Sequence, residues 1–139
     1  MLLNAQQSWE FGLLALCTWR EARGEPYRGK LAVAWSIRNR VFHPSWWGKT
    51  YPEVILKPFQ YSSFNHNDPN AVQMPLHDDT SFSECLAVCE DAYSGIGSDP
   101  TNDATHYHTA SLTGDSLPEW ARTATFKVQI GNHLFYVAQ

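Results

Sequence analysis

Apolar residues recur every three or four positions in several stretches of the chain, which is the spacing of helices that pack one face against a core. In the first stretch Trp9, Leu13, Leu16 and Cys17 share a face, and Ser8 is placed to cap the helix. The pattern predicts helices at about residues 8–21, 26–41 and 81–93, with a short helical turn after residue 50.

Residues that favour helix ends mark the boundaries of these elements. Pro26 suits the first turn of the second helix, where its missing N–H would have no partner. Thr50 with Glu53, and Ser81 with Glu84, have the spacing of a capping box. We therefore expect helices to begin at these positions.

Polar and apolar residues alternate in the last third of the chain, which predicts strands. Residues 105–109 alternate in this way, and residues 125–130 and 133–137 flank a Gly-Asn pair that favours a hairpin turn. Residues 57–77 are rich in Pro, Asn, Ser and Asp and are expected to form an irregular or hairpin region. The sequence thus predicts an α+β fold that is mainly helical, with a small antiparallel sheet.

The composition is that of one ordinary globular domain spanning residues 1–139. Hydrophobic residues make up 43% of the chain and charged residues 17%, which argues against disorder. Aromatic residues make up 14%, including six Trp. This surplus suits a groove in which flat rings stack on sugars, although any single ring is more often part of a core.

Charge is distributed unevenly along the chain. Residues 1–50 carry a net charge of +4 and residues 51–139 carry −8, for a total of −4. A basic face could steer the protein toward a polyanion such as bacterial wall or nucleic acid, or the same charges could solvate two helices. The basic residues concerned are Arg20, Arg23, Arg28, Lys30, Arg38 and Arg40.

Cysteine usage and the N-terminal residues bear on the compartment. Cys17, Cys85 and Cys89 lack the spacing of a disulfide framework, so we expect small buried apolar residues in a protein made in a reducing compartment. Residues 1–10 do not have the pattern of a signal peptide, and no stretch has the roughly 18 apolar residues that span a bilayer. We expect synthesis in the cytoplasm and no integral membrane segment.

Glu21 is the first candidate for catalysis. It falls at the end of an apolar helix, beside a break, where a carboxyl can be half-buried against rings such as Trp19 or Trp35. Desolvation raises the pKa of a carboxyl, which keeps it protonated and able to act as an acid. The alternative is a surface carboxylate paired with Arg20 or Arg23.

A second candidate site lies within residues 57–65, where rings alternate with amides and hydroxyls. As a strand, this segment would offer hydrogen bonds to N-acetyl and hydroxyl groups while its rings stack on sugars. An ordinary hairpin with a polar outer face is the alternative. The candidate residues are Phe59, Gln60, Tyr61, Ser62, Ser63 and Phe64.

Three histidines form a third candidate site. His106 and His108 project to the same face of a strand, and His133 lies in the last hairpin. With His133, His66 or a carboxylate as a third ligand, His106 and His108 could bind zinc in a peptidase or amidase, but no His-Glu-x-x-His or Cys-x-x-Cys motif accompanies them. We therefore expect no metal and no cofactor, and we expect substrate contact or core hydrogen bonding from these histidines.

Ordered sequence blocks give a more specific indication than spacing does. The run Glu-Ala-Arg-Gly-Glu-Pro at residues 21–26 resembles the signature of the SleB-type cell wall hydrolases, the spore-cortex-lytic family. The later blocks at residues 59–65, 104–108, 118–121 and 130–136 follow in the order of that family. The resemblance covers nearly the whole chain.

This resemblance implies a lysozyme-like catalytic domain that acts on peptidoglycan glycan strands, with Glu21 as the catalytic acid. It implies cleavage between N-acetylmuramic acid and N-acetylglucosamine, by a lytic transglycosylase that leaves a 1,6-anhydro end or by a muramidase. Substrate contacts are expected from Glu25, Phe59, Gln60, Tyr61, Ser62, Ser63, Phe64, His106, Tyr107, His108 and Trp120.

The chain departs from the spore members in lacking a signal peptide and a wall-binding repeat domain. This favours a bare, monomeric catalytic domain such as a phage endolysin, which would reach the wall through the host periplasm. Two rival functions are a zinc-dependent peptidoglycan peptidase or amidase and a non-catalytic module that binds wall or nucleic acid. The ordered blocks favour the glycan-cleaving enzyme, with no nucleic acid partner.

Overall fold

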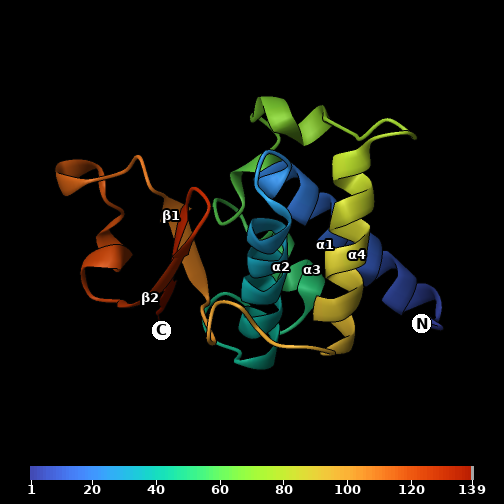
Figure 1. The fold of residues 1–139 in the computed structure, drawn as a ribbon, viewed down its shortest axis with the longest axis horizontal. Coiled ribbons are helices and arrows are strands. Elements are labelled where there is room, and N and C mark those ends of the chain that lie inside the picture. Colours follow the sequence, from blue (N-terminus) through green and yellow to red (C-terminus); the bar gives the residue numbers. More distant parts are fainter. Residues whose placement is uncertain (139) are drawn as a thin grey trace.

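The structure is a computed structural model that describes residues 1–138. Within these residues the chain forms four α-helices and one three-stranded sheet, joined by loops and short 3-10 helices (Figure 1). The helices lie together and the sheet lies beside them. Within these residues no helix has the length and apolar character needed to cross a membrane. The helices are α1 (Ala5–Ala22), α2 (Tyr27–Phe42), α3 (Tyr51–Leu56) and α4 (Thr80–Ser94), and the strands are β1 (His106–Thr109), β2 (Thr125–Ile130) and β3 (His133–Val137). Short 3-10 helices lie in the connections: η1 (Ser62–Phe64), η2 (Pro69–Val72), η3 (Gly114–Ser116) and η4 (Glu119–Arg122).

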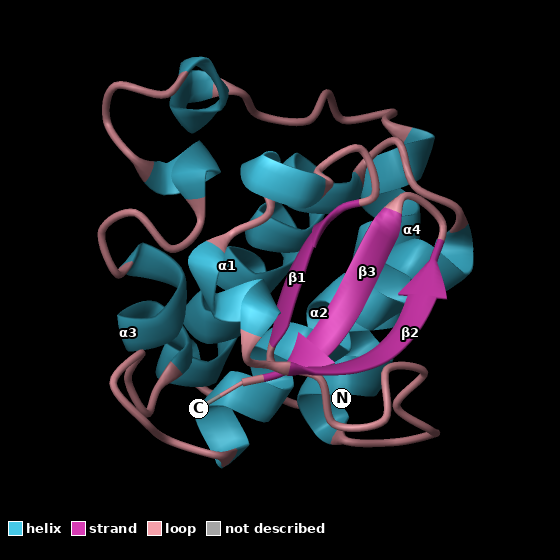
Figure 2. Cartoon of the chain, turned by 90° about the vertical axis from the view of Figure 1, so that its left-hand side faces the viewer, coloured by secondary structure: helices cyan, strands magenta, loops and turns pink. Residues whose placement is uncertain are grey.

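The sheet has the order β1-β3-β2, so the last strand in the chain lies in the middle (Figure 2). Both pairings are antiparallel, and a bulge interrupts the β2–β3 ladder between Phe126 and Val128. The turn between β2 and β3 places Gly131 at φ 58°, a left-handed conformation that favours glycine. The predicted strands are confirmed to within one residue, and so is the α+β class.

Two helices begin at different residues from those that the capping patterns predict. Asn4, not Ser8, caps α1, through a capping box with the residue three positions on. Asp79, not Ser81, caps α4, because its side chain accepts a hydrogen bond from the Phe82 backbone N–H. Asn and Asp cap as well as Ser, so each helix extends to the earlier capping residue. Thr50 caps α3 as predicted.

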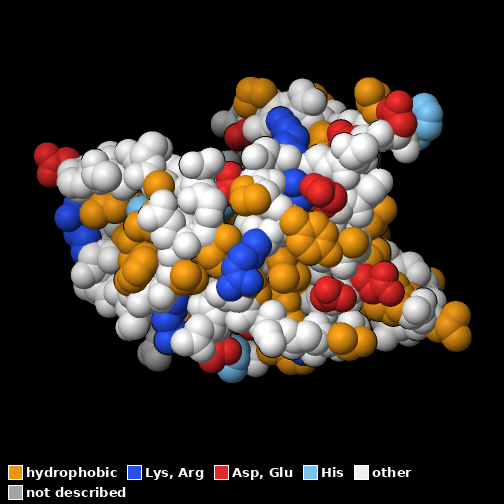
Figure 3. All heavy atoms as spheres, viewed as in Figure 1, with side chains coloured by type: hydrophobic (Ala, Val, Ile, Leu, Met, Phe, Trp, Pro, Cys, Tyr) orange, Lys and Arg blue, Asp and Glu red, His pale blue; other side chains and the backbone are white. Residues whose placement is uncertain are grey.

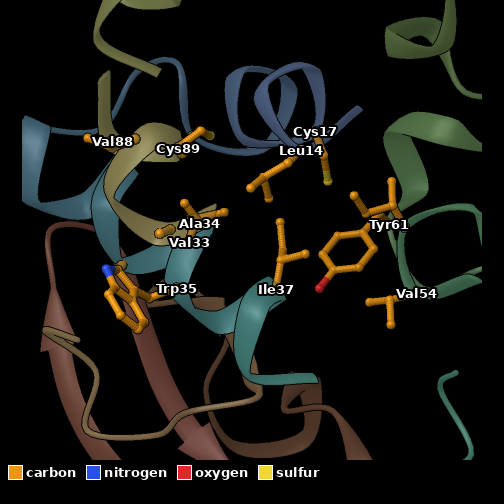
Figure 4. Close-up of a cluster of buried hydrophobic side chains, with 14 of the residues drawn as sticks. Leu14, Cys17, Val33, Ala34, Trp35, Ile37, Val54, Tyr61, Val88 and Cys89 are labelled. Carbon is orange, nitrogen blue, oxygen red and sulfur yellow. The ribbon is translucent and has the colours of Figure 1, made fainter. Parts of the chain in front are cut away.

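The hydrophobic core lies where α1, α2 and α4 meet. Figure 4 shows Leu14 and Cys17 of α1 near Ile37 of α2 and near Tyr61, which lies in the connection after α3. Leu14, Cys17 and Ile37 have no exposed surface. All three cysteines are free and buried, which confirms their predicted apolar role. This packing holds the C-terminal half of α1, where Glu21 lies, in a fixed position against α2.

Residues 57–77, called the strap below, lie against the C-terminal end of α1 without forming a strand. The Arg20 guanidinium holds them there, because it donates hydrogen bonds to the carbonyl oxygens of Ser63 at 3.3 Å, Ala71 at 3.0 Å and Gln73 at 3.0 Å. The irregular region predicted for residues 57–77 is therefore confirmed, and the hairpin alternative is wrong. The strap's carbonyl groups are satisfied by an arginine side chain and by local turns, not by a neighbouring strand.

The basic residues of the first two helices are largely used within the fold. Lys30 and Arg40 are buried, and Arg38 donates to the carbonyl oxygens of Ala92 and Tyr93 at the end of α4. Figure 3 shows separate basic side chains among apolar and acidic ones on this face of the molecule. The uneven charge of the sequence thus reflects arginines that bind carbonyl groups and rings more than a surface for a polyanion.

Replacing Arg20 by Met is expected to loosen the strap, because three strap carbonyl groups lose their shared donor. Limited proteolysis followed by mass spectrometry should detect cleavage within residues 63–77 about tenfold faster than in the wild type, which corresponds to about 1.4 kcal/mol of local opening. Arg23→Met is the matched control, since Arg23 makes one hydrogen bond, to the Asn70 side chain. Equal cleavage of the two variants would contradict this role of Arg20.

Candidate active site

The carboxyl group of Glu21 lies in the last turn of α1, between the strap and the sheet. Its Oε1 accepts a hydrogen bond from the Tyr107 hydroxyl at 2.7 Å, and its Oε2 accepts one from the Ser63 hydroxyl at 2.9 Å. Arg20 and Arg23 both bind the strap instead. Glu21 is therefore not the arginine-paired surface carboxylate that the sequence left open as an alternative.

Burial raises the pKa of Glu21 above its ordinary value. The hydrogen bonds from Tyr107 and Ser63 act in the opposite direction because they stabilise the carboxylate, and the charge of Asp68 raises the pKa further. The net direction is upward, so this carboxyl keeps its proton to a higher pH than an exposed glutamate. A partly desolvated carboxylic acid of this kind can act as a general acid.

Tyr107 reaches Glu21 from β1. The register pairs Tyr107 with Phe135, so the two side chains lie on the same face of the sheet. The Tyr107 ring also lies 4.8 Å from the His133 ring, centroid to centroid. Burial, with the nearby Glu21, raises the pKa of Tyr107 well above its ordinary value, so its hydroxyl stays protonated and remains a donor. The predicted packing of Glu21 against Trp19 or Trp35 stays a prediction.

Three of the predicted strap residues, Ser63, Tyr61 and Gln60, make contacts within the fold. Ser63 is buried and bonds the Glu21 carboxyl directly. Tyr61 is buried in the core, with the Arg40 guanidinium 5.3 Å from its ring centroid. Gln60 accepts a hydrogen bond from Arg40 at 3.3 Å. Arg40, which the site predictions omitted, thus ties the strap to α2.

Of the other predicted strap residues, Phe59 and Ser62 face outward, whereas Phe64 is partly buried against the core. Phe64 packs under the Arg20 guanidinium, 4.6 Å from the ring centroid. Phe59 is 82% exposed and has φ 67°, and Ser62 is exposed. These two side chains are free to meet a ligand, whereas Phe64 is part of the contact that fixes the strap.

His106, His108 and Trp120 form a separate cluster on the other face of the sheet, where both histidines are buried. The two histidines alternate with Tyr107 along β1 and so point away from Glu21. The Trp120 ring lies 4.9 Å from His106 and 6.0 Å from His108. Burial, together with the charge of Arg40, lowers the pKa of His106 to about 3, so this ring is neutral. The structure therefore does not bring these three predicted residues together with Glu21.

The geometry of the sheet does not support a three-histidine zinc site. The register pairs His133 with Thr109, which puts His133 on the face opposite His106 and His108. His108 is also engaged, with Nδ1 2.7 Å from its neighbour's carbonyl oxygen and Nε2 3.0 Å from the Tyr136 hydroxyl. Within residues 1–138 no group of three or more His, Cys, Asp or Glu side chains could hold a metal ion.

Glu25 lies inside the fold, contrary to its predicted contact with substrate. Its Oε1 accepts a hydrogen bond from the Asn132 backbone N–H at 2.7 Å, and its Oε2 accepts one from the Asn132 side-chain amide at 3.1 Å. The side chain is only 8% exposed. The sequence gives no local signal for this partner, because the two residues are 107 positions apart.

Two cavities lie away from Glu21. One of about 600 Å³ opens at the end of α2 and includes Phe42, Trp47 and Asp103, and one of about 370 Å³ lies between Trp46 and Leu56. Neither is lined by Glu21. The aromatic-lined groove expected around Glu21 therefore stays a prediction.

This chain is similar to a family described as Cell Wall Hydrolase and to proteins named spore cortex-lytic enzymes. Residues 24–136 match the model of a family described as Cell Wall Hydrolase. The spore cortex-lytic enzyme of Halalkalibacterium halodurans is 34% identical over 127 residues, which cover 88% of this chain and 33% of that protein. The Bacillus cereus spore cortex-lytic enzyme is 31% identical over 132 residues, which cover 95% of this chain and 46% of that protein. The chain thus spans less than half the length of these two relatives.

Two solved structures match the fold. The catalytic domain of the germination-specific lytic transglycosylase SleB from Bacillus anthracis superposes with a TM-score of 0.74 at 27% identity, covering 97% of this chain and 99% of that one. The catalytic domain of Bacillus cereus SleB gives a TM-score of 0.68 at 28% identity, covering 98% of this chain and 94% of that one. The predicted lysozyme-like α+β fold is therefore confirmed. The family match begins three residues after Glu21, so the role of Glu21 rests on its geometry.

Replacing Glu21 by Gln is expected to stabilise the protein at alkaline pH. Because the folded protein raises the pKa of Glu21, its contribution to stability falls as the pH rises from the unfolded-state pKa through the folded-state pKa. Above that window the buried carboxylate is destabilising, and the amide is not. The melting temperature of Glu21→Gln should exceed that of the wild type at pH 8, by about 2–4 °C for each kcal/mol gained, and the difference should vanish near pH 4.

Glu90→Gln is the control for this measurement, since Glu90 is exposed on α4 and should melt like the wild type at both pH values. A Glu21→Gln protein that melts lower than the wild type at pH 8 would contradict the desolvation of Glu21.

Proposed function

The chain belongs to the cell wall hydrolase family, and from this premise we propose that it is a lytic transglycosylase that cleaves peptidoglycan glycan strands with Glu21 as its general acid. The carboxyl of Glu21, partly desolvated and held by the Tyr107 and Ser63 hydroxyls, is the observation that carries the proposal. The similarity to a SleB domain described as a lytic transglycosylase supports the reaction type. Residues 1–139 would act as one catalytic domain.

In the proposed reaction, protonated Glu21 donates its proton to the oxygen of the bond between N-acetylmuramic acid and N-acetylglucosamine. The bond from that oxygen to C1 breaks as an oxocarbenium-like state develops. The Glu21 carboxylate then takes the proton of the muramic C6 hydroxyl, whose oxygen bonds to C1 and forms the 1,6-anhydro ring. Glu21 is protonated again, and no water is consumed.

The surroundings of Glu21 support a reaction with one carboxyl group. Hydrolysis by two carboxylates needs a second acid about 5–9.5 Å from the first. Glu25 is bound to Asn132 and faces the hairpin turn. Asp68 is the acidic residue whose charge raises the pKa of Glu21. Its side chain caps η2 by accepting a hydrogen bond from the Asn70 backbone N–H. A muramidase route would therefore depend on Asp68.

Substrate contacts are proposed for the exposed strap residues beside Ser63. Phe59 offers a ring that is 82% exposed, and Ser62 offers an exposed hydroxyl. A sugar ring that stacks on Phe59 would lie next to the segment that supports the Glu21 carboxyl. Contacts from His106 and His108 would require their buried rings to become accessible on the face of the sheet opposite Tyr107, where Trp120 covers them.

The rival functions are less well supported. The zinc peptidase would need His133 on the same face of the sheet as His106 and His108, and it lies on the other. A non-catalytic binding module gives no reason for a carboxyl held between two hydroxyls. Action as a phage endolysin, delivery through the host periplasm and a monomeric state stay predictions from the sequence.

Digestion of purified peptidoglycan should release muropeptides with 1,6-anhydro ends, which mass spectrometry detects as products about 18 Da lighter than those with reducing ends. Glu21→Gln should release no product above background, because it cannot donate a proton. Asp68→Asn should retain activity within about tenfold. Reducing ends that disappear in Asp68→Asn would instead indicate a muramidase with two acids, and product from Glu21→Gln would exclude Glu21 as the acid.

Replacing Tyr107 by Phe should lower kcat and move the alkaline limb of the pH–rate profile to higher pH. The Tyr107 hydrogen bond lowers the pKa of Glu21, so its loss raises that pKa and keeps the acid protonated further into the alkaline range. Tyr93→Phe is the matched control, since the Tyr93 hydroxyl bonds a different carboxyl, that of Glu10. An alkaline limb that stays in place or moves to lower pH in Tyr107→Phe would contradict Glu21 as the titrating acid.

A further inference from the structure

Glu25 links the junction of α1 and α2 to the turn between β2 and β3. Its carboxylate accepts two hydrogen bonds from Asn132, at 2.7 and 3.1 Å. The turn approaches so closely that a Cβ on Gly131 would lie 2.5 Å from Oε1 of Glu25. Glycine at this position therefore permits the contact, and the contact fixes the turn against the helices.

The same turn leads directly to the residues behind Tyr107. His133 follows Asn132, and its Nδ1 lies 3.6 Å from Oε1 of Glu25. Burial lowers the pKa of His133, so its ring packs as a neutral group. That ring lies 4.8 Å from the Tyr107 ring, and the Tyr107 hydroxyl in turn donates to Glu21. A continuous series of contacts thus runs from Glu25 to Glu21 through the sheet.

We propose that Glu25 is a positioning residue, which fixes the β2–β3 turn and so holds His133 against Tyr107 and the Tyr107 hydroxyl on Glu21. The consequence for catalysis rests on the proposed function, in which Glu21 is the acid. The claim that Glu25 determines the position of the Tyr107 hydroxyl does not rest on the proposed function, because it concerns geometry alone. Glu25 thereby has a role in the site without contact with the substrate.

Glu25 acts on Glu21 through geometry and not through its charge. The groups that shift the pKa of Glu21 are Tyr107, Ser63 and Asp68, and Glu25 is not among them. The other titratable groups close to Glu21 are Cys17 of α1 and Tyr61 of the strap, both buried. A rise in the pKa of Glu21 after Glu25→Gln would therefore report a displaced Tyr107 hydroxyl, because removing a negative charge would by itself lower that pKa.

The test is an NMR titration of the ¹³C-labelled Glu21 carboxyl, assigned by its absence in Glu21→Gln, in four proteins: wild type, Glu25→Gln, Tyr107→Phe and the double variant. Glu25→Gln should raise the pKa of Glu21 in the same direction as Tyr107→Phe. In the Tyr107→Phe background it should cause no further rise, because the hydrogen bond that it disturbs is already absent. Asn132→Ala, which keeps the backbone N–H donor, should give a smaller rise.

Glu84→Gln is the matched control. Glu84 lies on α4 and accepts a hydrogen bond from Lys30, which also donates to the Glu25 carbonyl oxygen, so its loss should leave the pKa of Glu21 unchanged. An unchanged pKa of Glu21 in folded Glu25→Gln, or rises that add in the double variant, would overturn the proposal.

Kinetics on peptidoglycan give a second readout. Glu25→Gln should lower kcat by about tenfold to a hundredfold at constant KM, the size expected for a small displacement in an active site. A higher KM at constant kcat would identify Glu25 as a substrate contact and overturn its positioning role. Because the titration needs no turnover, it decides the geometric claim even if the protein does not cleave glycans.

Discussion

The structure around the site depends on one arrangement, a carboxyl withdrawn from water and held by two hydroxyl groups. Removing a carboxylate from water is costly, and the hydrogen bonds of Glu21 offset only part of that cost, so its pKa rises. The two donors come from residues 42 and 86 positions away in the sequence. The end of α1, the strap and β1 must therefore all be held within hydrogen-bonding distance of one side chain.

Separate polar contacts hold each of these parts. Arg20 binds three carbonyl groups of the strap, and Arg40 donates to the Thr105 carbonyl oxygen just before β1 at 2.6 Å while it also reaches Gln60. Glu25 holds the turn of the sheet through Asn132. The contacts of these charged side chains hold Ser63 and Tyr107 within hydrogen-bonding distance of the two carboxyl oxygens of Glu21.

The sequence predicts what depends on neighbouring residues and misses what depends on distant ones. Helical periodicity and the Gly-Asn turn give the helices and the β2–β3 hairpin, because both depend on contacts within a few residues. Whether Ser8 or Asn4 caps α1 is a near-equal local choice, and the sequence cannot decide it. The strap was predicted as an irregular or hairpin region, and the sequence does not decide between the two because nothing in it reveals that Arg20 satisfies the strap's carbonyl groups. Glu21 was identified by a family motif, whereas Ser63 was one of six equivalent candidates until the fold placed it.

The chemistry of the hydrogen-bond donors explains why two glutamates four residues apart have different roles. The backbone N–H of Asn132 can only donate, and Nδ2 of its side chain donates to Glu25 as well, so both contacts suit a carboxylate. The hydroxyls of Tyr107 and Ser63 can donate to a carboxylate or accept from a carboxylic acid by rotating one O–H bond. Glu21 can therefore lose and regain a proton without leaving an unsatisfied partner, as an acid that acts twice in one reaction must. The same carboxyl placed among fixed N–H donors would be better stabilised as an anion and a poorer proton donor.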